Sequence, residues 1–386
     1  MSHQKIVYLA GPEIDQMQVN KIAKDAGCME YFFIERRGIE LGWIGVSGAE
    51  IVGESESANV RWGRGASVIL PGAVTAQLDQ YEGDMEHSYA LIDDVHDGKA
   101  LVQSMEDNGF FQRLPSTYQF IGGFSDESDM QGIEQLEFEA LEGKNVVADN
   151  LWMKASWLSF DDEDASLRFR FSYGREGLED VAKDYQREKL TAELAQAIFP
   201  ESKAITDNAA LVGQITEASN IQQPAFVERI YYFNAPNGGA QFHHDVERGH
   251  DGVVYAQMFG STAWLALPKP ELLDEIIRFA SGDNIASLLE AYFSSDELPE
   301  LLKYITDRQF WSDCLDNRDS EIAERFLNQI PEFFAFLIDA GYASILRAGD
   351  VILLPQAGLD DCCWHSVFCL DDFPGEALSF AIRESA

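Results

Sequence analysis

Short runs in which apolar and polar residues alternate predict strands in the first 170 residues of the chain. KIVYLAG, MEYFFIE, GIELGWIGV and GASVILPG are expected to be strands between polar turns, with helical structure around residues 130–142. Further on, LWMKASWLSF and SLRFRFSY flank an acidic turn, and apolar side chains alternate with polar ones from Leu167 onward. This arrangement predicts a half-buried hairpin. The region as a whole is expected to be α+β.

The pattern changes to helical spacing at about residue 176. Apolar residues recur every three or four positions as far as Phe199, and Pro200 follows. Such spacing predicts an amphipathic helix that the proline ends. We place a domain boundary at this change, with an N-terminal α+β domain of unknown role at 1–175 and a second domain at 176–386.

The second domain contains two groups of strand-like segments. The first group is VERIYYFNAP, GVVYAQMF and STAWLALP, and the second is SILRAGDVILLP, CCWHSVFCL and ALSFAIR. Residues 270–341 between them have helical periodicity and few strand signals. The chain is therefore expected to be mainly β with α+β additions, and its C-terminal sheet structure is expected to be interrupted by a helical insertion.

Composition indicates a protein with a substantial core. Of the 386 residues, 46% are apolar and 12% are aromatic, which excludes wholesale disorder. No apolar run reaches the roughly 18 residues that span a bilayer, and MSHQKIVYLAG lacks the pattern of a secretory signal. We expect a soluble, cytoplasmic protein without a membrane partner.

The charge balance restricts the partners of the chain. Its formal net charge is −38, which would repel a phosphate backbone and excludes nucleic acid as an expected partner. Such acidity is typical of proteins from saline habitats, and steering of a cationic substrate or a basic protein is the alternative explanation. The five cysteines are odd in number and form no C-x-x-C pair, which favours a reducing compartment.

The candidate chemistry lies among the histidines. His243, His244 and His250 fall within eight residues, and His365 follows the second strand group. In an extended strand His243 and Asp245 would share a face that His244 does not. Two imidazoles and one carboxylate on one face of a metal form the facial triad of non-haem Fe(II) oxygenases. The tripeptide H-x-D alone is common by chance, so its flanking sequence matters.

Four segments flank these residues in a recognisable order. They are APNGGAQFHHD, with a glycine-rich turn before H-x-D; GVVYAQMFGSTAWLALP, with Gln-x-x-Gly and a strand ending at proline; AGDVILLPQAGLDDCCWHSV, with a Gly–Asp strand, a proline turn and a histidine; and ALSFAIR, a closing strand ending in arginine. Together they resemble the cupin-like Jumonji-C family, especially its bacterial ribosomal-oxygenase branch, over roughly residues 225–268 and 343–386. The resemblance implies a double-stranded β-helix, or jelly roll.

Carried over position by position, the resemblance implies that His243, Asp245 and His365 bind Fe(II). It also implies 2-oxoglutarate as co-substrate, chelating the iron through its 2-oxo acid end while a basic side chain pairs with its far carboxylate. Arg383 is the candidate for that pairing. It shares a strand face with Ser379, opposite apolar residues, and should point into the barrel.

The chain departs from the family pattern at the co-substrate site. Many members have Lys or Arg two residues past the glycine, where this chain has Thr262. Thr262, Tyr232 and Arg383 are therefore expected to share the contacts to 2-oxoglutarate. Three alternatives stay open: a cupin-type iron oxygenase that does not use 2-oxoglutarate, a non-catalytic metal-bound binding module, and manganese, nickel or zinc in place of iron.

The implied reaction is hydroxylation of an unactivated C–H bond in an amino acid, a peptide or a natural product. The expected partner is thus a small-molecule or peptide substrate, and the helical insertion is a candidate surface for a homodimer. Hydroxylation is preferred to halogenation because Asp245 fills the position that halide would need. Loop histidines such as His244 and buried cysteines such as Cys362 and Cys363 are more often structural than functional.

Overall fold

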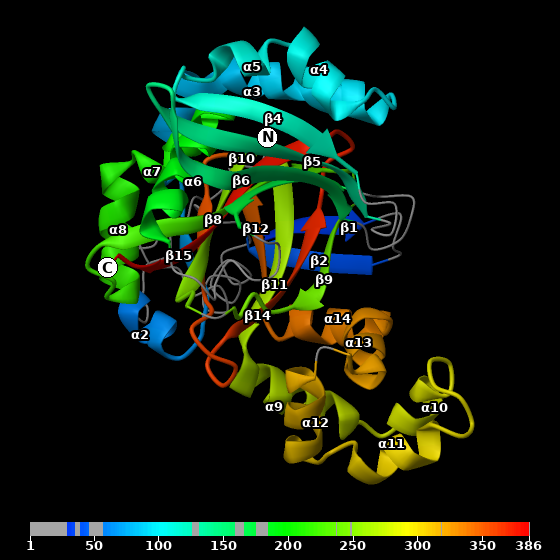
Figure 1. Ribbon diagram of the computed structural model, residues 1–386. Helices are drawn as coiled ribbons and strands as arrows, with labels where there is room; N and C mark the ends of the chain where they lie inside the picture. Colours follow the sequence, from blue (N-terminus) through cyan, green and yellow to red (C-terminus); the bar gives the residue numbers. More distant parts are fainter. Residues whose placement is uncertain are drawn as a thin grey trace, which may run out of the picture.

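Two antiparallel sheets dominate the computed structural model, with helices on their outer sides (Figure 1). The structure describes residues 29–34, 39–45, 57–125, 131–158, 166–174, 184–236, 238–247, 249–317 and 319–385. The larger sheet has nine strands in the spatial order β3 (Val68–Leu70), β13 (Val351–Pro355), β10 (Gly252–Phe259), β15 (Gly375–Glu384), β8 (Pro224–Asn234), β7 (Ser166–Tyr173), β6 (Asn145–Leu158), β5 (Gly132–Glu142) and β4 (Tyr118–Phe124). The smaller has four, in the order β12 (Ala343–Arg347), β11 (Ser261–Pro268), β14 (Cys363–Cys369) and β9 (Gly239–His243). A separate pair is formed by β1 (Met29–Ile34) and β2 (Ile39–Gly45).

The chain alternates between the two large sheets along its C-terminal half. Strands β8, β10, β13 and β15 belong to the nine-stranded sheet, and β9, β11, β12 and β14 to the four-stranded sheet. The chain stays in one sheet only from β11 to β12, and the helical insertion lies at this point. The molecule is a sheet-rich α+β protein with large antiparallel sheets, which is consistent with the expected cupin-like fold.

Apolar side chains on the inner faces hold the two sheets together. Tyr255 of β10 and Trp264 of β11 belong to one buried cluster with residues of β13 and β14. Along β10, Val254 and Ala256 point the other way and join the cluster behind the nine-stranded sheet. Because both faces of β10 are covered, the strand is a nearly continuous apolar run, as expected for a central strand.

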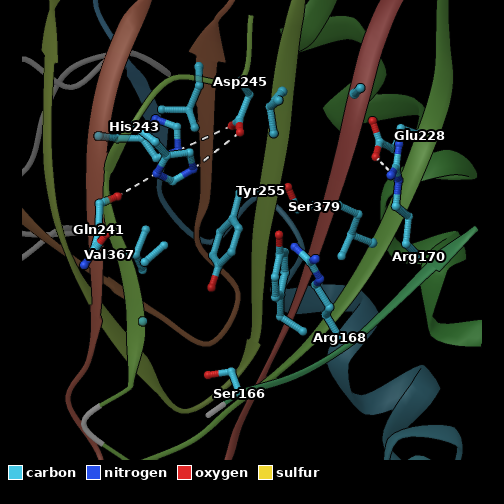
Figure 2. Close-up of a pocket in the computed structure, with 18 of the residues that line it drawn as sticks. Ser166, Arg168, Arg170, Glu228, Gln241, His243, Asp245, Tyr255, Val367 and Ser379 are labelled. Carbon is cyan, nitrogen blue, oxygen red and sulfur yellow. Dashed lines mark hydrogen bonds and ion pairs between the residues drawn. The ribbon is translucent and has the colours of Figure 1, made fainter. Parts of the chain in front are cut away.

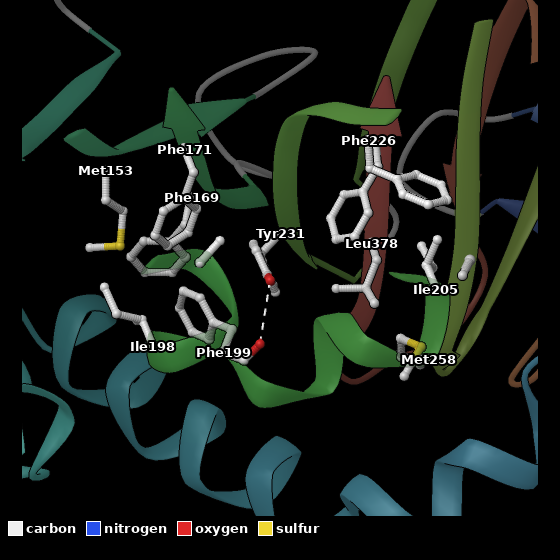
Figure 3. Close-up of a cluster of buried hydrophobic side chains, with 14 of the residues drawn as sticks. Met153, Phe169, Phe171, Ile198, Phe199, Ile205, Phe226, Tyr231, Met258 and Leu378 are labelled. Atoms are coloured by element: carbon white, nitrogen blue, oxygen red, sulfur yellow. Dashed lines mark hydrogen bonds between the residues drawn. The ribbon is translucent and has the colours of Figure 1, made fainter. Parts of the chain in front are cut away.

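The largest apolar cluster lies behind the nine-stranded sheet, where Phe169, Phe199 and Tyr231 pack against one another (Figure 3). It runs from Ala58 to Ile382, so the sheet and its core both cross the predicted boundary at residue 175. The elements that follow β2 and cover this face are α2 (Ala58–Gly63), α3 (Thr75–His96), α4 (Leu101–Asp107), α5 (Phe110–Arg113), α6 (Tyr185–Ile198), η2 (Pro200–Ser202), α7 (Lys203–Thr206) and α8 (Ala209–Ser219).

The predicted insertion at 270–341 is helical, as expected. Its helices are α9 (Lys269–Ala280), α10 (Ile285–Leu289), α11 (Leu298–Tyr304), α12 (Arg308–Asp316), α13 (Glu321–Asn328) and α14 (Pro331–Asp339). Trp311, Phe326 and Phe333 are fully buried among them. The same cluster includes Leu265 and Phe368 of the four-stranded sheet, so the insertion covers the outer side of that sheet.

Other elements test the remaining predictions. The hairpin is confirmed, with β6 and β7 paired antiparallel, although its turn lies outside the described residues. The helix before Pro200 is confirmed from Tyr185 onward as α6, whereas its predicted start at 176–183 and the segment KIVYLAG lie outside the described residues. The helix around 130–142 is wrong: these residues form β5, in which Leu136, Phe138 and Ala140 alternate with more exposed residues. No described helix has the length and apolarity to cross a membrane.

Candidate metal centre

Two neighbouring strands of the four-stranded sheet bring the predicted metal ligands together. Strands β9 and β14 pair antiparallel, with His243 directly opposite His365. The two imidazole centroids are 4.3 Å apart. Asp245 follows β9 by two residues, so its carboxylate returns to the side of His243, as the H-x-D spacing predicts.

The three side chains converge on one point, and Figure 2 shows His243 and Asp245 pointing toward each other. His243 Nε2 lies 3.4 Å from Asp245 Oδ1, and His365 Nε2 lies 3.4 Å from Asp245 Oδ2. One ligand atom from each residue falls within 4.8 Å of the others, which is compatible with a shared metal ion. Two imidazole nitrogens and a carboxylate oxygen suit Fe(II), and also Mn(II), Ni(II) or Zn(II).

Backbone carbonyls orient both imidazoles. His243 Nδ1 lies 2.6 Å from the carbonyl oxygen of Gln241, and His365 Nδ1 lies 3.2 Å from that of Cys363. A carbonyl can only accept a hydrogen bond, so each Nδ1 carries the proton and donates it. This leaves Nε2 as the metal-facing nitrogen on both rings, and metal-binding histidines usually donate their other ring N–H to such a partner.

The Asp245 carboxylate and the two imidazoles shift one another's pKa values. Burial opposes the charge of Asp245, yet His243 and His365 hold the pKa of its carboxyl well below the usual range. Burial and repulsion by His243 lower the pKa of His365 to about 4. Burial also acts against the charged form of His243, but Asp245 raises its pKa above the ordinary value. Near neutral pH the site thus offers the Asp245 carboxylate and the neutral imidazole of His365, and metal binding would compete with protonation of His243.

The triad forms part of the wall of a cavity of about 510 Å³ between the two sheets. The side chains of His243 and Asp245 keep 41% and 36% of their surface exposed, whereas His365 keeps only 4% and stacks on Trp264 at 5.6 Å. A cavity of this size is typical of sites for small ligands. A metal bound here would be reached from the cavity through the side of His243 and Asp245.

The residues predicted to contact 2-oxoglutarate lie at different places. Tyr232 lines the cavity. Thr262 is fully buried and does not line it: its hydroxyl donates to Gln257 Oε1 at 2.8 Å and accepts from Trp264 Nε1 at 3.0 Å. The Tyr255 hydroxyl donates to the same oxygen at 3.2 Å. Thr262 therefore belongs to a buried network that supports Trp264 and Tyr255.

Arg383 does not reach the cavity either, and the expectation that it points into the barrel is wrong. Its guanidinium is buried and forms an ion pair with Glu188 of α6. It also lies 5.5 Å from the ring centroid of Tyr185 on the same helix. A buried guanidinium needs a countercharge, and Glu188, which is distant in sequence, supplies it on the opposite side of the nine-stranded sheet from the cavity.

Two arginines that the sequence had not indicated line the cavity instead. Arg168 and Arg170 lie on β7, and Figure 2 shows them across the cavity from His243. Arg168 Nε donates to Ser156 Oγ at 2.7 Å, and Arg170 forms an ion pair with Glu228 of β8. The signal in the sequence was their alternation with Leu167 and Phe169, but solvent-facing residues of a half-buried strand give the same pattern.

His244, Cys362 and Cys363, the weaker candidates for contacts to metal or substrate, have packing contacts. The His244 ring packs edge-on against Trp364 at 5.0 Å. Burial raises the pKa of the Cys362 thiol to about 12, and its Sγ donates to the carbonyl of Leu359. Among the described residues, neither Cys362 nor Cys363 belongs to a group of potential metal ligands. Both cysteines are fully buried, in agreement with their expected packing role.

A second group of potential ligands, Glu228, Glu247 and His250, lines the same cavity. Glu228 is already held by Arg170, and His250 Nδ1 is 3.8 Å from a Glu247 oxygen. A cation there would compete with a guanidinium, so the triad is the stronger metal site.

No protein-family model matches the sequence, and no curated protein matches it. Among solved structures, the chain is similar to a 2OG-Fe(II) oxygenase family oxidoreductase from Burkholderia pseudomallei, at 8% identity and a TM-score of 0.29, over 86% of this chain and 93% of that one. It is also similar to YcfD, a ribosomal oxygenase from Escherichia coli, at 11% identity and a TM-score of 0.22, over 72% of this chain and 43% of that one. The chain thus spans less than half of YcfD. What the site can do follows from its own side chains.

Proposed function

We propose that this chain is an Fe(II)- and 2-oxoglutarate-dependent oxygenase that hydroxylates an unactivated C–H bond of an amino acid, a peptide or a natural product. In this proposal, β8 to β15 form a double-stranded β-helix around the cavity. The observation that carries the proposal is the convergence of two imidazole Nε2 atoms on the two oxygens of one carboxylate, each at 3.4 Å. This donor set occupies one face of a metal and leaves the other positions open.

Each group of the triad has a definite task in this proposal. His243, Asp245 and His365 would hold the iron, with each Nδ1–H fixed by a backbone carbonyl. Bound iron together with a 2-oxo acid supplies the oxygen activation that C–H hydroxylation needs. Trp264 and the apolar residues around His365 exclude water from one side of the site, and the cavity orients the substrate on the other.

Formation of succinate from 2-oxoglutarate tests this function. The Fe(II)-loaded protein is incubated with 2-oxoglutarate and oxygen, first alone and then with a panel of amino acids and peptides. We expect succinate to form only when iron is present and to be lost in His243→Ala. Protein that binds iron but forms no succinate under any of these conditions would contradict the use of 2-oxoglutarate.

A second candidate is an iron oxygenase that does not use 2-oxoglutarate. It is favoured by the engagement of two predicted co-substrate residues elsewhere, Thr262 with Gln257 and Arg383 with Glu188. Oxygen consumption by the iron-loaded protein with a substrate but without 2-oxoglutarate would identify it.

A further inference from the structure

Arg168 is unusual among the cations of this acidic protein because its hydrogen-bond partner is a neutral hydroxyl. The chain has 66 acidic residues against 28 lysines and arginines, so most cations are expected to have an acidic neighbour. The Nε of Arg168 donates to the neutral hydroxyl of Ser156 at 2.7 Å. Within the described part of the chain, its terminal nitrogens Nη1 and Nη2 form no further hydrogen bond or ion pair. The side chain is half-buried and lines the cavity.

Arg170 shows what the usual arrangement would be. It lies two residues away on the same face of β7 and lines the same cavity. Its guanidinium pairs with the carboxylate of Glu228 and lies 5.6 Å from the ring centroid of Trp152. The charge of Arg170 is therefore neutralised within the protein, whereas the guanidinium of Arg168 is available to a ligand in the cavity.

Sheet register and a shared cavity relate Arg168 to the metal site. Arg168 on β7 is paired with Tyr232 on β8. Burial raises the pKa of the Tyr232 hydroxyl to about 12, with Arg168 opposing this shift and Asp245 adding to it. Tyr232 and Arg168 line the same cavity as the triad, and Figure 2 shows Arg168 across that cavity from His243. A ligand that reaches from the metal past Tyr232 would meet Arg168.

We propose that Arg168 binds the far carboxylate of the 2-oxo acid that occupies the metal site. The inference rests on the proposed function, and it assigns to β7 the contact that was expected from Arg383 and Thr262. A guanidinium with both terminal nitrogens available can bind a carboxylate through two parallel hydrogen bonds. The region before residue 175 then supplies part of the site, because its hairpin extends the sheet and carries the anchoring charge.

The test compares two ligands that differ only at the far end. Mn(II)-loaded protein is titrated by calorimetry with 2-oxoglutarate and with 2-oxopentanoate, which has a methyl group in place of the far carboxylate. We expect the unmodified protein to prefer 2-oxoglutarate. Arg168→Gln should lower the affinity for 2-oxoglutarate by about 10- to 100-fold, the usual loss for a charged hydrogen bond, and leave 2-oxopentanoate binding unchanged.

Two further variants complete the design. Arg170→Gln is the matched control, and less than about a threefold change in 2-oxoglutarate affinity is expected because its charge is already offset. Arg168→Met keeps the aliphatic stem of the side chain and is measured in parallel to guard against a folding defect in Arg168→Gln. It should show the same selective loss.

The role of Arg168, the presence of an anchor for the far carboxylate and the binding of a 2-oxo acid can each fail separately. If the Arg168 variants bind 2-oxoglutarate normally, or lose both acids equally while retaining Mn(II), Arg168 does not bind the carboxylate. If the unmodified protein binds both acids equally, the far carboxylate has no anchor and the inference fails while the metal site stands. If the Mn(II)-loaded protein binds neither acid, the proposed co-substrate fails and this inference fails with it.

Discussion

The two sheets provide opposite walls of the cavity, and the walls are built in different ways. The metal wall consists of β9, β14 and the residues His243, Asp245 and His365, and short-range contacts shape it. Each imidazole is held by a carbonyl two residues earlier in its own strand. The arginine wall consists of β7 with Arg168 and Arg170, and its character depends on long-range contacts to Ser156 and Glu228.

The availability of each arginine to a ligand depends on its partner in the neighbouring strand. Arg168 and Arg170 are the same residue type, on the same face of the same strand, yet only Arg170 has a carboxylate partner among the described residues. One residue of the neighbouring strand, Glu228, therefore decides which guanidinium can serve a ligand. The metal wall has no comparable dependence, because its donor atoms are fixed locally.

The largest expected effect is the loss of metal binding when the metal wall loses a donor. His365→Ala should lower the affinity for Fe(II) or Mn(II) by at least about 100-fold, since even the loss of a hydrogen-bond partner of a metal ligand costs about 10- to 100-fold. His244→Ala is the matched control, because His244 packs against Trp364 and is not one of the three donors. Metal retained by His365→Ala but lost by His244→Ala, measured by titration, would show that the metal wall is wrongly assigned.

A smaller effect separates a structural residue from a ligand-binding one. Thr262→Val should leave Trp264 Nε1 without its acceptor and weaken the network at Gln257. We expect the free energy of unfolding to fall by about 1–3 kcal/mol, with 2-oxoglutarate affinity within about twofold of the unmodified protein. Urea unfolding and calorimetry measure the two quantities. Unchanged stability with strongly reduced binding would return Thr262 to the co-substrate site.

Another test concerns the face of the nine-stranded sheet that points away from the cavity. Glu376 of β15 is fully buried, and neither of its oxygens has a hydrogen-bond partner among the described residues. Burial raises its pKa well above the ordinary value, and burial raises that of nearby Glu201 to about 7. Folding thus favours the protonated acids. The two acids therefore destabilise the folded protein least below about pH 4.5, and the destabilisation grows as the pH rises toward and beyond about 7.

Replacing Glu376 should remove part of this pH dependence. Glu376→Gln is expected to raise the melting temperature at about pH 8 by roughly 2 °C or more and to flatten its decline between about pH 5 and pH 8. Metal binding should not change, since the residue lies on the outer face of the sheet. Melting curves at several pH values decide the matter, and parallel profiles for the two proteins would refute the role of Glu376.

The smallest expected effect is a gain in 2-oxoglutarate affinity when Arg170 loses its carboxylate partner. Glu228→Gln removes the countercharge of Arg170 and should raise the affinity for 2-oxoglutarate by about two- to fivefold, the scale of one partly exposed ion pair. The gain should vanish in the double variant with Arg170→Gln. A lower affinity in Glu228→Gln would show that this carboxylate, and not the guanidinium, serves the ligand.

The parts of the molecule that could be predicted from sequence are those with local signals. The spacing of His243 and Asp245 at the end of a strand indicated a shared face, and the structure brings them together with His365. The helical insertion was predicted because its periodicity extends over many turns. By contrast, GIEQLEFEALE is rich in helix-forming glutamate, but pairing with β4 and β6 makes it a strand.

The parts that could not be predicted depend on partners distant in sequence. Alternation in SLRFRFSY shows that Arg168 and Leu167 face opposite ways, but not whether the polar face meets solvent or a cavity. Alternation likewise placed Arg383 toward the barrel, and Glu188 of α6 holds it elsewhere. The change of pattern near residue 175 marks a change of element type, whereas one core extends across it.

Anaerobic titration of the protein with Fe(II), followed by 2-oxoglutarate, tests both the iron site and the use of the 2-oxo acid. We expect a weak visible charge-transfer band when the 2-oxo acid chelates the iron, and loss of this band in His243→Ala. Iron binding without such a band would contradict the use of 2-oxoglutarate, and failure to bind iron at all would contradict the triad itself.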